Sequence, residues 1–454
     1  MMQSLFPDDN HLGLLTDLYE LTMAAGYHVH GMAQQRATFE LWVRHLPGCR
    51  NYLVAAGLEQ AIAYLTHLSF ASEQIEYLRD HPVFRDVPGD WFEHLADLRF
   101  TGDAWAIPEG TVVFAGEPLM RITAPIEQAQ IVETFLITTL TVQTMIATKA
   151  SRICSAGQGR LVFDFGSRRA HGPQAGLLAA RAAFIGGCCG TSNTEAARQL
   201  GIPSLGTQAH AWIMAWGDEA EAFRRFSTLF PHAATLLIDS YDTVQGVRNA
   251  LASGSAMQAV RLDSGDLLTL SKEVRQILDA AGRSDVRIVA SGDLNEYKIR
   301  DLLAAKAPID SFGVGTELVT SRDEPTLGMV YKLVEQETPA GKVGCFKSAT
   351  AKKTYPFAKQ VFRETNSDGF FSRDVIALGD ETLPGDPLLI PMMQSGRLLR
   401  PLPTLAEIQT RCRVQLGRLP APLHSLEPVA DPYPMVLSER LEGEAQRLVA
   451  MNTR

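Results

Sequence analysis

Polar residues gather where short apolar runs of the sequence end, and their types suit the binding of a phosphorylated ligand. In parallel β/α folds the active site lies at the carboxyl ends of the strands, so clusters at successive strand ends point at one pocket. A single polar, Gly-rich turn is ordinary loop chemistry, whereas six in register indicate a site. The clusters are Asp164-Phe-Gly-Ser-Arg-Arg-Ala-His171, Gly206-Thr-Gln-Ala-His210, Asp239-Ser-Tyr-Asp242, Arg261-Leu-Asp-Ser-Gly-Asp266, Ser291-Gly-Asp293 and Gly313-Val-Gly-Thr316.

Two of these clusters are short loops that come just before expected helices, where backbone N–H groups can cradle a phosphate. They are Ser291-Gly292-Asp293 and Gly313-Val-Gly315-Thr316. Neither is a Walker loop, and Gly313-Val-Gly-Thr lacks the third glycine of a dinucleotide fingerprint. Arg168, Arg169 and Arg261 add forked donors for a carboxylate or a diphosphate.

Acidic residues and one histidine complete the set. An aspartate in such a place can hold Mg²⁺ or ribose hydroxyls, although taken alone it is more often a helix N-cap. The aspartates concerned are Asp239, Asp242, Asp263, Asp266 and Asp293. His210 stands at a strand-to-helix turn, where an imidazole can act as acid, base or phosphoryl acceptor. Phosphate, diphosphate, sugar and metal chemistry together indicate a sugar-phosphate substrate.

The elements that position these residues follow a repeated strand–helix rhythm, which predicts a parallel α/β architecture. Seven such units favour a barrel or a strongly curved sheet, with an open doubly wound sheet as the alternative. We expect an N-terminal part at 1–125, a catalytic β/α barrel at 126–339 and a C-terminal part at 340–454 that packs back on the first. The expected strands are Leu161–Phe165, Ile202–Gly206, Thr235–Asp239, Ala259–Asp263, Val286–Ala290, Ser311–Gly315 and Met329–Val334; the helices between them include 242–251, 267–281 and 294–303.

Composition narrows the class of protein. The formal net charge of -9 over 454 residues lacks the electrostatic footprint of a general nucleic-acid binder. The six cysteines form no CxxC pair, which is typical of a reducing cytosol and predicts no structural metal site. The N-terminus has no basic region followed by an apolar core, and the apolar stretch Ile131–Ala150 carries Glu133, Gln143 and Lys149. We therefore expect a cytoplasmic protein with no membrane span.

These residues resemble the nicotinate phosphoribosyltransferase family. The resemblance extends in order from about residue 12 to residue 363, and the last ninety residues carry little of it. Besides the strand-end clusters, it rests on Leu15-Thr-Asp-Leu-Tyr-Glu-Leu-Thr-Met23, Phe39-Glu-Leu-Trp-Val-Arg44, Asn51-Tyr-Leu-Val-Ala-Ala-Gly-Leu-Glu59 and Gly190-Thr-Ser-Asn193. It implies an irregular seven-stranded β/α barrel plus a mixed α/β domain built from the N- and C-terminal segments.

The resemblance also implies a reaction. Nicotinate, phosphoribosyl pyrophosphate, ATP and water give nicotinate mononucleotide, diphosphate, ADP and phosphate, the first step from nicotinic acid to NAD. ATP acts through a phosphohistidine, matched by His210, with Asp239 as the candidate that orients the imidazole or holds Mg²⁺ with the substrate. Nicotinate is expected between Phe165 and Tyr19 of a partner subunit in a homodimer with a shared active site, its carboxylate facing Arg261 and Thr207. The implied phosphoribosyl and phosphate contacts are Arg168, Asp263, Ser291, Gly292, Asp293, Gly313, Gly315 and Thr316.

Three alternatives stay open. Nicotinamide phosphoribosyltransferase shares the fold, but it usually has an acidic residue where this chain has Ala209. A non-catalytic phosphoribosyl-ligand sensor would not need His210. Purine-type phosphoribosyltransferases carry two adjacent acids after a strand, whereas Asp239 and Asp242 are separated. One local departure is Phe357, which stands where the resembled family usually has Gly.

Overall fold

The chain folds into two compact units in the computed structural model, which describes residues 8–347 and 354–452. The first unit joins both chain ends, residues 1–144 and 326–454, and the second comprises residues 145–325. The unit boundaries therefore fall at 144/145 and 325/326 rather than at 125/126 and 339/340. Helix α6 (Glu133–Ala156) begins in the first unit and ends in the second.

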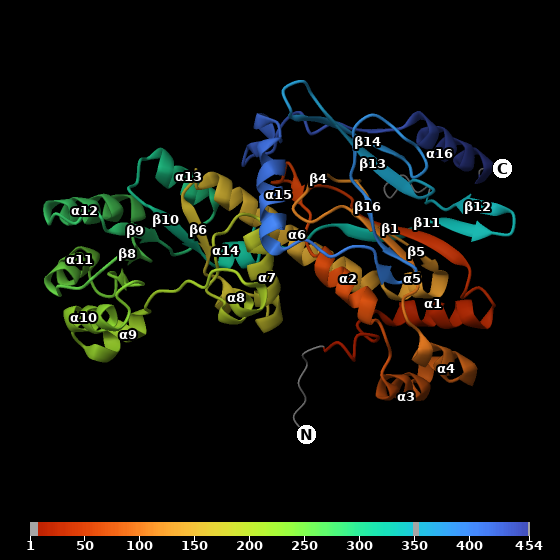
Figure 1. The fold of residues 1–454 in the computed structure, drawn as a ribbon, viewed down its shortest axis with the longest axis horizontal. Helices are drawn as coiled ribbons and strands as arrows, with labels where there is room; N and C mark the ends of the chain where they lie inside the picture. The colour runs from red at the N-terminus through yellow and green to blue at the C-terminus, as the bar shows by residue number, and fades with distance from the viewer. Residues whose placement is uncertain (1–7, 348–353, 453–454) are drawn as a thin grey trace. The chain divides into compact units, whose positions relative to one another are not determined.

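The second unit is built on a five-stranded parallel sheet in the order β6-β10-β9-β8-β7. Its strands are short apolar runs whose facing residues Leu236, Val260 and Ile288 are register partners and fully buried. Helices alternate with the strands along the chain, and Figure 1 shows α11, α12 and α13 beside β8, β9 and β10. The strands are β6 (Leu161–Asp164), β7 (Thr235–Leu237), β8 (Ala259–Leu262), β9 (Arg287–Ala290) and β10 (Ser311–Val314).

The helices of this unit begin where the polar strand-end clusters lie. Asp242 caps α11 by accepting from the N–H of Gln245, and Asp266 caps α12 by accepting from the N–H groups of Leu268 and Thr269. The capping interpretation of these two aspartates is therefore confirmed. The helices are η2 (Ser167–Arg169), α7 (Pro173–Ile185), α8 (Thr194–Leu200), α9 (His210–Trp216), α10 (Glu219–Leu229), α11 (Thr243–Ala252), α12 (Leu267–Ala280), α13 (Glu296–Ala304) and α14 (Thr316–Val319).

The parallel α/β character of this region is as expected, but no closed seven-stranded barrel is seen in the described residues. Parallel one-residue bridges from Asp164 to Thr191 and from Thr191 to Ser204 extend the sheet beyond β6. The expected strand at 202–206 is thus a single bridge, and β7 forms the other edge of the sheet. The expected seventh strand, Met329–Val334, lies elsewhere: it is part of β11 (Met329–Thr338), which pairs antiparallel with β1 (Arg36–Val43) in the first unit.

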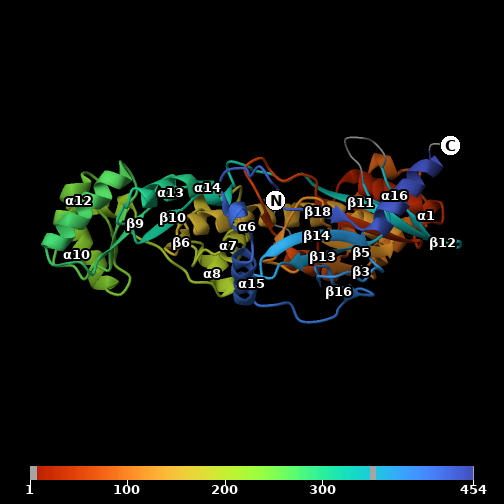
Figure 2. The ribbon, with the colours of Figure 1, turned by 90° about the horizontal axis from the view of Figure 1, so that it is seen from above.

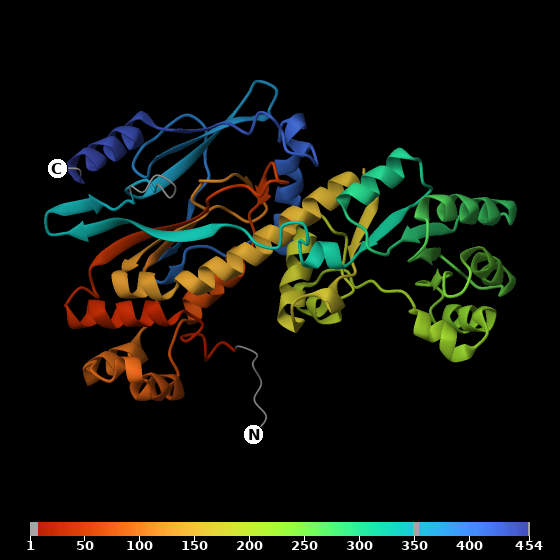
Figure 3. The same ribbon diagram turned by 180° about the vertical axis from the view of Figure 1, so that it is seen from behind.

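The first unit contains a seven-stranded sheet in the order β12-β11-β1-β5-β3-β16-β17 and a four-stranded sheet in the order β15-β13-β14-β18. Figure 3 shows α1 (Leu18–Val29) and α5 (Ile126–Ile131) on one side of the larger sheet. The two sheets are joined where the Lys359 N–H donates to the buried Glu40 carboxylate at 2.7 Å, and their strands lie close together in Figure 2. The remaining strands are β2 (Leu53–Val54), β3 (Asp103–Ala106), β4 (Val112–Val113), β5 (Met120–Pro125), β12 (Gly341–Gly344), β13 (Lys359–Thr365), β14 (Phe371–Leu378), β15 (Asp386–Pro387), β16 (Ile390–Gln394), β17 (Arg397–Leu398) and β18 (Met435–Leu437).

This unit also contains several helices besides α1 and α5. They are α2 (Leu58–His67), α3 (Ser72–Asp80), η1 (Pro82–Phe84), α4 (Gly89–Asp97), α15 (Leu405–Gly417), η3 (Ala421–His424) and α16 (Glu439–Asn452). The turn around Phe357, the departure from the resembled family, adopts the left-handed φ of 65° that glycine accepts most easily. The chain therefore keeps this turn conformation with a side chain present, at a cost of about 1–2 kcal/mol.

One helical stretch among the described residues, 126–156, is long and apolar enough to cross a membrane. Within its most apolar window 67% of the residues are buried inside the protein. Lys149, near the end of the stretch, is fully buried and takes part in ion pairs. These features are typical of the core helix of a globular fold.

Candidate active site

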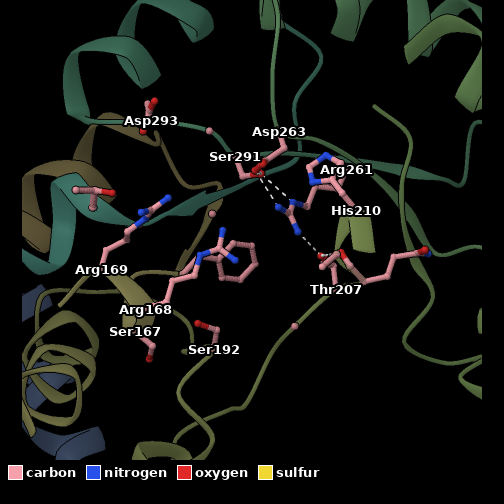
Figure 4. Close-up of a pocket in the computed structure, with 18 residues that line it drawn as sticks. Ser167, Arg168, Arg169, Ser192, Thr207, His210, Arg261, Asp263, Ser291 and Asp293 are labelled. Atoms are coloured by element: carbon pink, nitrogen blue, oxygen red, sulfur yellow. Dashed lines mark hydrogen bonds and ion pairs between the residues drawn. The ribbon is translucent and has the colours of Figure 1, made fainter. Parts of the chain in front are cut away.

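A cavity of about 540 Å³ opens at the carboxyl ends of the parallel strands. It is lined from five strand-end clusters, which places most of the expected site residues around one space, shown in Figure 4. The lining residues are Phe165, Ser167, Arg168, Arg169, Ser192, Gly206, Thr207, Gln208, Ala209, His210, Arg261, Asp263, Ser291, Gly292, Asp293, Gly313, Gly315 and Thr316.

The segment that follows β6 positions the aromatic and cationic side chains of the cavity, Phe165, Arg168 and Arg169. Asp164 is buried, and its carboxylate accepts from the N–H of Gly166 at 2.8 Å and from the hydroxyl of Thr191 at 2.7 Å. These bonds fix the chain as it turns from Phe165 into η2, because a buried carboxylate needs both partners. Burial raises the pKa of Asp164, and the two hydrogen bonds oppose that rise.

Two arginines from η2, Arg168 and Arg169, bring positive charge to the cavity. Figure 4 shows both side chains extending from the same side into the lined space. Within residues 8–347 and 354–452, neither guanidinium has an ion-pair partner. Unpaired arginines at a concave site are suited to an anion with several phosphate oxygens, which guanidinium binds in a forked geometry.

Arg261, at the third position of β8, is held in a hydrogen-bond network. Its Nε donates to Ser291 Oγ at 2.9 Å, Nη1 to the hydroxyl of Thr207 and Nη2 to Asp263 Oδ1 at 2.8 Å. Only 12% of its side chain is exposed, so the guanidinium plane is well fixed. A fixed guanidinium with N–H groups left over is suited to orient a planar carboxylate.

Asp263 is ionised in this network. Burial raises the pKa of Asp263, but hydrogen bonds from Ser291 and Arg261 and their positive surroundings outweigh that effect and leave the pKa below its ordinary value. A carboxylate that stays charged at neutral pH is a good acceptor for sugar hydroxyls.

His210 is the first residue of α9 and lies beside Asp239. Its Nε2 is 3.3 Å from Asp239 Oδ1, and the imidazole side chain is 40% exposed whereas Asp239 is 1% exposed. The second carboxylate oxygen of Asp239 accepts from the N–H of Asp263 at 3.0 Å and from the hydroxyl of Ser264 at 2.6 Å. Asp239 does not line the cavity itself, and its engaged oxygens favour orientation of the imidazole over metal binding.

The two expected phosphate loops contain glycines that the backbone requires. Gly292 has a φ of 92°, and a Cβ there would lie 2.0 Å from the carbonyl oxygen of Asp263. At Gly313 a Cβ would lie 2.2 Å from the ring of Phe165. Gly313 therefore lets the aromatic ring lie against the loop, a packing reason that the sequence pattern does not reveal.

A buried lysine connects the helices that follow these loops. Lys149 Nζ lies 2.6 Å from Glu296 at the start of α13 and 3.8 Å from Glu317 in α14. It also lies 2.8 Å from Asp323, while Arg152 Nε pairs with Glu296 at 3.1 Å. Because α13 and α14 begin just after the Gly292 and Gly315 loops, this ion-pair network fixes the helix starts that position both loops.

Tyr19, which is expected to act from a partner subunit, belongs to α1 of the first unit, is 49% exposed, and is not among the residues that line the cavity of its own chain. Sequence reasoning missed other lining residues. Gln208 lines the cavity, is 4% exposed, and carries two buried amide atoms without hydrogen-bond partners in the described chain. In the sequence, the position of Gln208 between Thr207 and His210 is the one feature that could have indicated that it lines the site. Ser167 and Ser192 are further lining residues that the expected set omitted.

The arrangement combines an aromatic ring, a fixed guanidinium, two unpaired arginines, an ionised aspartate and two glycine loops. A planar aromatic acid can lie at the Phe165 and Arg261 end, and a phosphorylated sugar can lie along the arginines and loops. Catalysis at such a site consists mainly of positioning and charge stabilisation, which is the requirement for displacement of a diphosphate.

Comparison with known proteins agrees with this geometry. Family models match residues 14–141 (nicotinate phosphoribosyltransferase N-terminal domain), 161–375 (the nicotinate phosphoribosyltransferase family) and 384–443 (its C-terminal domain). A nicotinate phosphoribosyltransferase of Mycobacterium tuberculosis is 45% identical over 446 residues, which are 96% of this chain and 94% of that protein. The Bacillus subtilis enzyme of that name is 42% identical over 391 residues, covering 84% and 79%.

A solved structure extends the likeness to three dimensions. Human nicotinic acid phosphoribosyltransferase superimposes with a TM-score of 0.85 at 27% identity, covering 96% of this chain and 100% of the human one. The match at 384–443 also covers a segment in which the sequence motifs showed little resemblance. On these grounds, the chain belongs to the nicotinate phosphoribosyltransferase family.

Proposed function

We propose that this protein is a nicotinate phosphoribosyltransferase, which transfers the phosphoribosyl group of phosphoribosyl pyrophosphate to nicotinate in the synthesis of NAD from nicotinic acid. The observation that carries the proposal is the cavity in which Arg261 is fixed beside Phe165 while Arg168 and Arg169 remain unpaired. Those side chains match an aromatic carboxylate and a multiply charged sugar phosphate.

In this proposal the nicotinate ring lies against Phe165, and its carboxylate accepts from the free N–H groups of Arg261 near Thr207. The ribose hydroxyls face Asp263 and Asp293, and the 5′-phosphate lies on the Gly292 and Gly313–Thr316 loops. The pyridine nitrogen then forms a bond to the anomeric carbon with its own electron pair. The bond from that carbon to the diphosphate oxygen breaks, and the diphosphate leaves with the bonding electrons. Arg168 and Arg169 stabilise the charge that develops there.

The coupling to ATP is part of the proposal, with His210 as the phosphoryl acceptor. The Asp239 contact to Nε2 supports this assignment, because a carboxylate on one ring nitrogen leaves the other available as nucleophile. The bond between the γ-phosphorus and the bridging oxygen of ATP breaks, ADP leaves, and a phosphorus–nitrogen bond forms. Mg²⁺ is expected as the companion of the phosphorylated substrates, and no step is assigned to an ion on Asp239.

The histidine proposal has a direct chemical test. Brief exposure to labelled ATP and Mg²⁺ should give an acid-labile label, since phosphoramidates hydrolyse in acid, and His210→Ala should abolish both the label and ATP hydrolysis. Base transfer should persist weakly, because the other contacts lie on different residues. A label that maps to another residue, or wild-type ATPase activity in His210→Ala, would refute it.

We further propose a homodimer in which Tyr19 of the partner subunit completes the nicotinate site. The exposed apolar side chains of α1, Leu18 at 45% and Tyr19 at 49%, support the assignment of this helix to an interface. Mixing the impaired Tyr19→Ala and His210→Ala chains should raise the activity above that of either variant alone, because one hybrid site has both residues intact. Absence of recovery, when subunit exchange is independently verified, counts against a shared site.

A cytoplasmic location belongs to the same proposal and accords with the expected supply of ATP and phosphoribosyl pyrophosphate.

The rival substrate is nicotinamide. Arg261 favours a carboxylate, and Ala209 stands where nicotinamide-using relatives of this fold usually have an acidic residue. A diphosphate-release assay with nicotinate, nicotinamide or no base separates the alternatives. We expect turnover with nicotinate and at least tenfold less with nicotinamide, from roughly 1.5–3 kcal/mol of charge-assisted hydrogen bonding. Equal turnover with both bases refutes the specificity, and no turnover with either base refutes the enzyme in favour of a ligand sensor.

A further inference from the structure

Two histidines and a buried glutamate from three separate helices meet in the first unit, whereas the candidate active site belongs to the second. They are His28 in the last turn of α1, His94 in α4 and Glu127 in the first turn of α5. One ligand atom from each lies within 4.8 Å of the other two. The two imidazole centroids are 4.9 Å apart, with the ring planes inclined by 35°.

The carboxylate of Glu127 is the anchor of this cluster, because its side chain is 1% exposed. Its Oε1 accepts from the indole N–H of Trp91 at 3.1 Å, and its Oε2 lies 2.7 Å from His94 Nε2. In the described part of the chain no lysine or arginine pairs with Glu127. A buried carboxylate without a permanent cation is costly, so the cluster favours a bound positive charge.

A fourth candidate ligand lies at the rim. Asp90 Oδ2 is 3.5 Å from His28 Nε2, and Asp90 is one helical turn before His94 on the same face of α4. The side chains of His28 and His94 are 21% and 31% exposed, whereas that of Asp90 is 70% exposed. The cluster therefore has a buried carboxylate, two partly exposed imidazoles and an exposed carboxylate at its rim.

We propose that His28, His94 and Glu127 form a divalent metal site, with Asp90 or water as the fourth ligand. Two imidazoles and a carboxylate are the ligand set that Zn²⁺ takes readily, whereas Mg²⁺ and Ca²⁺ prefer oxygen alone. This departs from the expectation of no structural metal, which rested on the cysteines and could not anticipate a cluster assembled from residues far apart in the sequence.

The geometry is close to what zinc needs. Tetrahedral zinc with bonds of roughly 2.0–2.1 Å places its ligand atoms roughly 3.3 Å apart. The widest separation, at most 4.8 Å, therefore has to shrink by up to about 1.5 Å, and the 2.7 Å between His94 Nε2 and Glu127 Oε2 has to widen, which rotations of the two partly exposed histidine side chains can supply. The Trp91 N–H on the far oxygen of Glu127 orients the carboxylate, as partners of metal ligands usually do.

Binding requires a simple exchange of protons. In the metal-free state His94 Nε2 donates to Glu127, and in the metal-bound state the neutral imidazole carries its proton on Nδ1, so Nε2 presents a lone pair. The bound ion would join α1, α4 and α5. Because α1 also carries Tyr19, the site would order the helix that the proposed function assigns to the partner's pocket.

The experiment titrates chelator-treated, metal-free protein with Zn²⁺ in competition with a chromophoric chelator. We expect one equivalent per chain with a rise in melting temperature, and an affinity loss of at least tenfold in His28→Gln, His94→Ala and Glu127→Gln. The matched control is His67→Ala, because the His67 ring is hydrogen-bonded to the Ala63 carbonyl of its own helix and is not part of the cluster, so binding should be unchanged. Glu127→Gln can still accept from Trp91, and His28 is at the rim, so these variants retain the packing if His94→Ala does not fold.

Two further readouts fix the location of the ion. Co²⁺ in place of Zn²⁺ should give visible absorption bands of a nitrogen- and oxygen-ligated site in the wild type and in His67→Ala, and no such bands in His28→Gln. His210→Ala should bind as the wild type does. The proposal is overturned if the metal-free wild type binds no Zn²⁺, if the three cluster variants bind it unchanged, or if His210→Ala alone loses it. None of these outcomes depends on turnover, so failure of the metal site and failure of the proposed enzyme are distinguishable.

Discussion

Replacing Arg261 by alanine should change the choice between nicotinate and nicotinamide rather than merely lower activity. A guanidinium has five N–H groups, and three hydrogen bonds hold the Arg261 side chain to Ser291, Thr207 and Asp263. Two N–H groups are left, one on each terminal nitrogen, for a carboxylate to accept. A hydrogen bond to a charged group contributes roughly 1.5–3 kcal/mol, and Asp263 offsets part of the positive charge. The expected contribution is thus about 2 kcal/mol, or a factor of roughly thirty.

The assay measures kcat/KM for both bases at saturating phosphoribosyl pyrophosphate, and the informative quantity is their ratio. Loss of fold or of phosphoribosyl binding cancels in this ratio, since both bases suffer equally. Arg261→Ala should reduce the nicotinate preference by roughly ten- to a hundredfold, and Arg261→Lys should reduce it less, because the charge remains without the fork. Arg168→Ala is the control: it should lower both kcat/KM values and leave the ratio alone. A ratio that stays within twofold of the wild type in Arg261→Ala refutes the assignment.

Four further outcomes follow from the structure. Gly292→Ala should raise the KM for phosphoribosyl pyrophosphate more than tenfold, because its Cβ would lie 2.0 Å from the Asp263 carbonyl oxygen and because strain at such a φ costs about 1–3 kcal/mol. The control is Gly206→Ala, whose Cβ would have no atom within 4 Å, and equal KM values for the two variants would contradict this prediction. Lys149→Met should lower the free energy of unfolding by about 1–3 kcal/mol, measured by urea denaturation, since Glu296 then keeps only Arg152 as a cationic partner and Asp323 loses its contact with Lys149. An unchanged free energy of unfolding would mean that Lys149 contributes little to the network. Asp239→Asn should slow the ATP-dependent labelling of His210 at least tenfold while the nicotinate KM changes less than threefold, and the reverse pattern would assign Asp239 to the base site. Burial raises the pKa of Glu20 from 4.5 to about 7, so ionisation of this carboxyl destabilises the fold as the pH rises between those values. Glu20→Gln should therefore raise the free energy of unfolding by about 1–3 kcal/mol at pH 8 and hardly at all at pH 4. Equal effects at both pH values would show that ionisation of Glu20 does not destabilise the protein.

Local patterns located the strand ends of the second unit well. Apolar runs such as 259–262 and 287–290 stop at a polar turn, and a capping residue, Asp266 or Asn295, begins the next helix, so both signals lie within a few residues of each other. The clusters that end these runs share one cavity because parallel strands place their carboxyl ends at one edge. That is the part of the site for which local sequence suffices.

Pairing partners are non-local, and there the patterns failed. The run Met329–Val334 has the same apolar character as a buried parallel strand, yet it pairs antiparallel with β1, about three hundred residues earlier along the chain. The run Ile202–Gly206 contributes only one bridge at Ser204. Short runs of this kind carry no information on the direction or the length of their pairing.

Buried polar groups were equally hard to foresee. Lys149 lies in an apolar helix, where the sequence suggested only that the segment is not a membrane span, and its role depends on Glu296 and Asp323 more than a hundred residues away. His28, His94 and Glu127 likewise come together only when three helices pack. Such clusters follow from tertiary structure, whereas a CxxC or a Walker loop is visible in the sequence itself.

The most direct test of the account is to identify the product. Purified protein is incubated with ring-labelled nicotinate, phosphoribosyl pyrophosphate, ATP and Mg²⁺, and labelled nicotinate mononucleotide is quantified by mass spectrometry, beside an Arg168→Ala/Arg169→Ala double variant. We expect the labelled mononucleotide from the wild type, and at least a tenfold loss at unchanged melting temperature from the double variant, because two unpaired arginines leave the cavity. No labelled mononucleotide from the wild type, or undiminished product from the double variant, would contradict the claim that this cavity transfers phosphoribosyl groups to nicotinate.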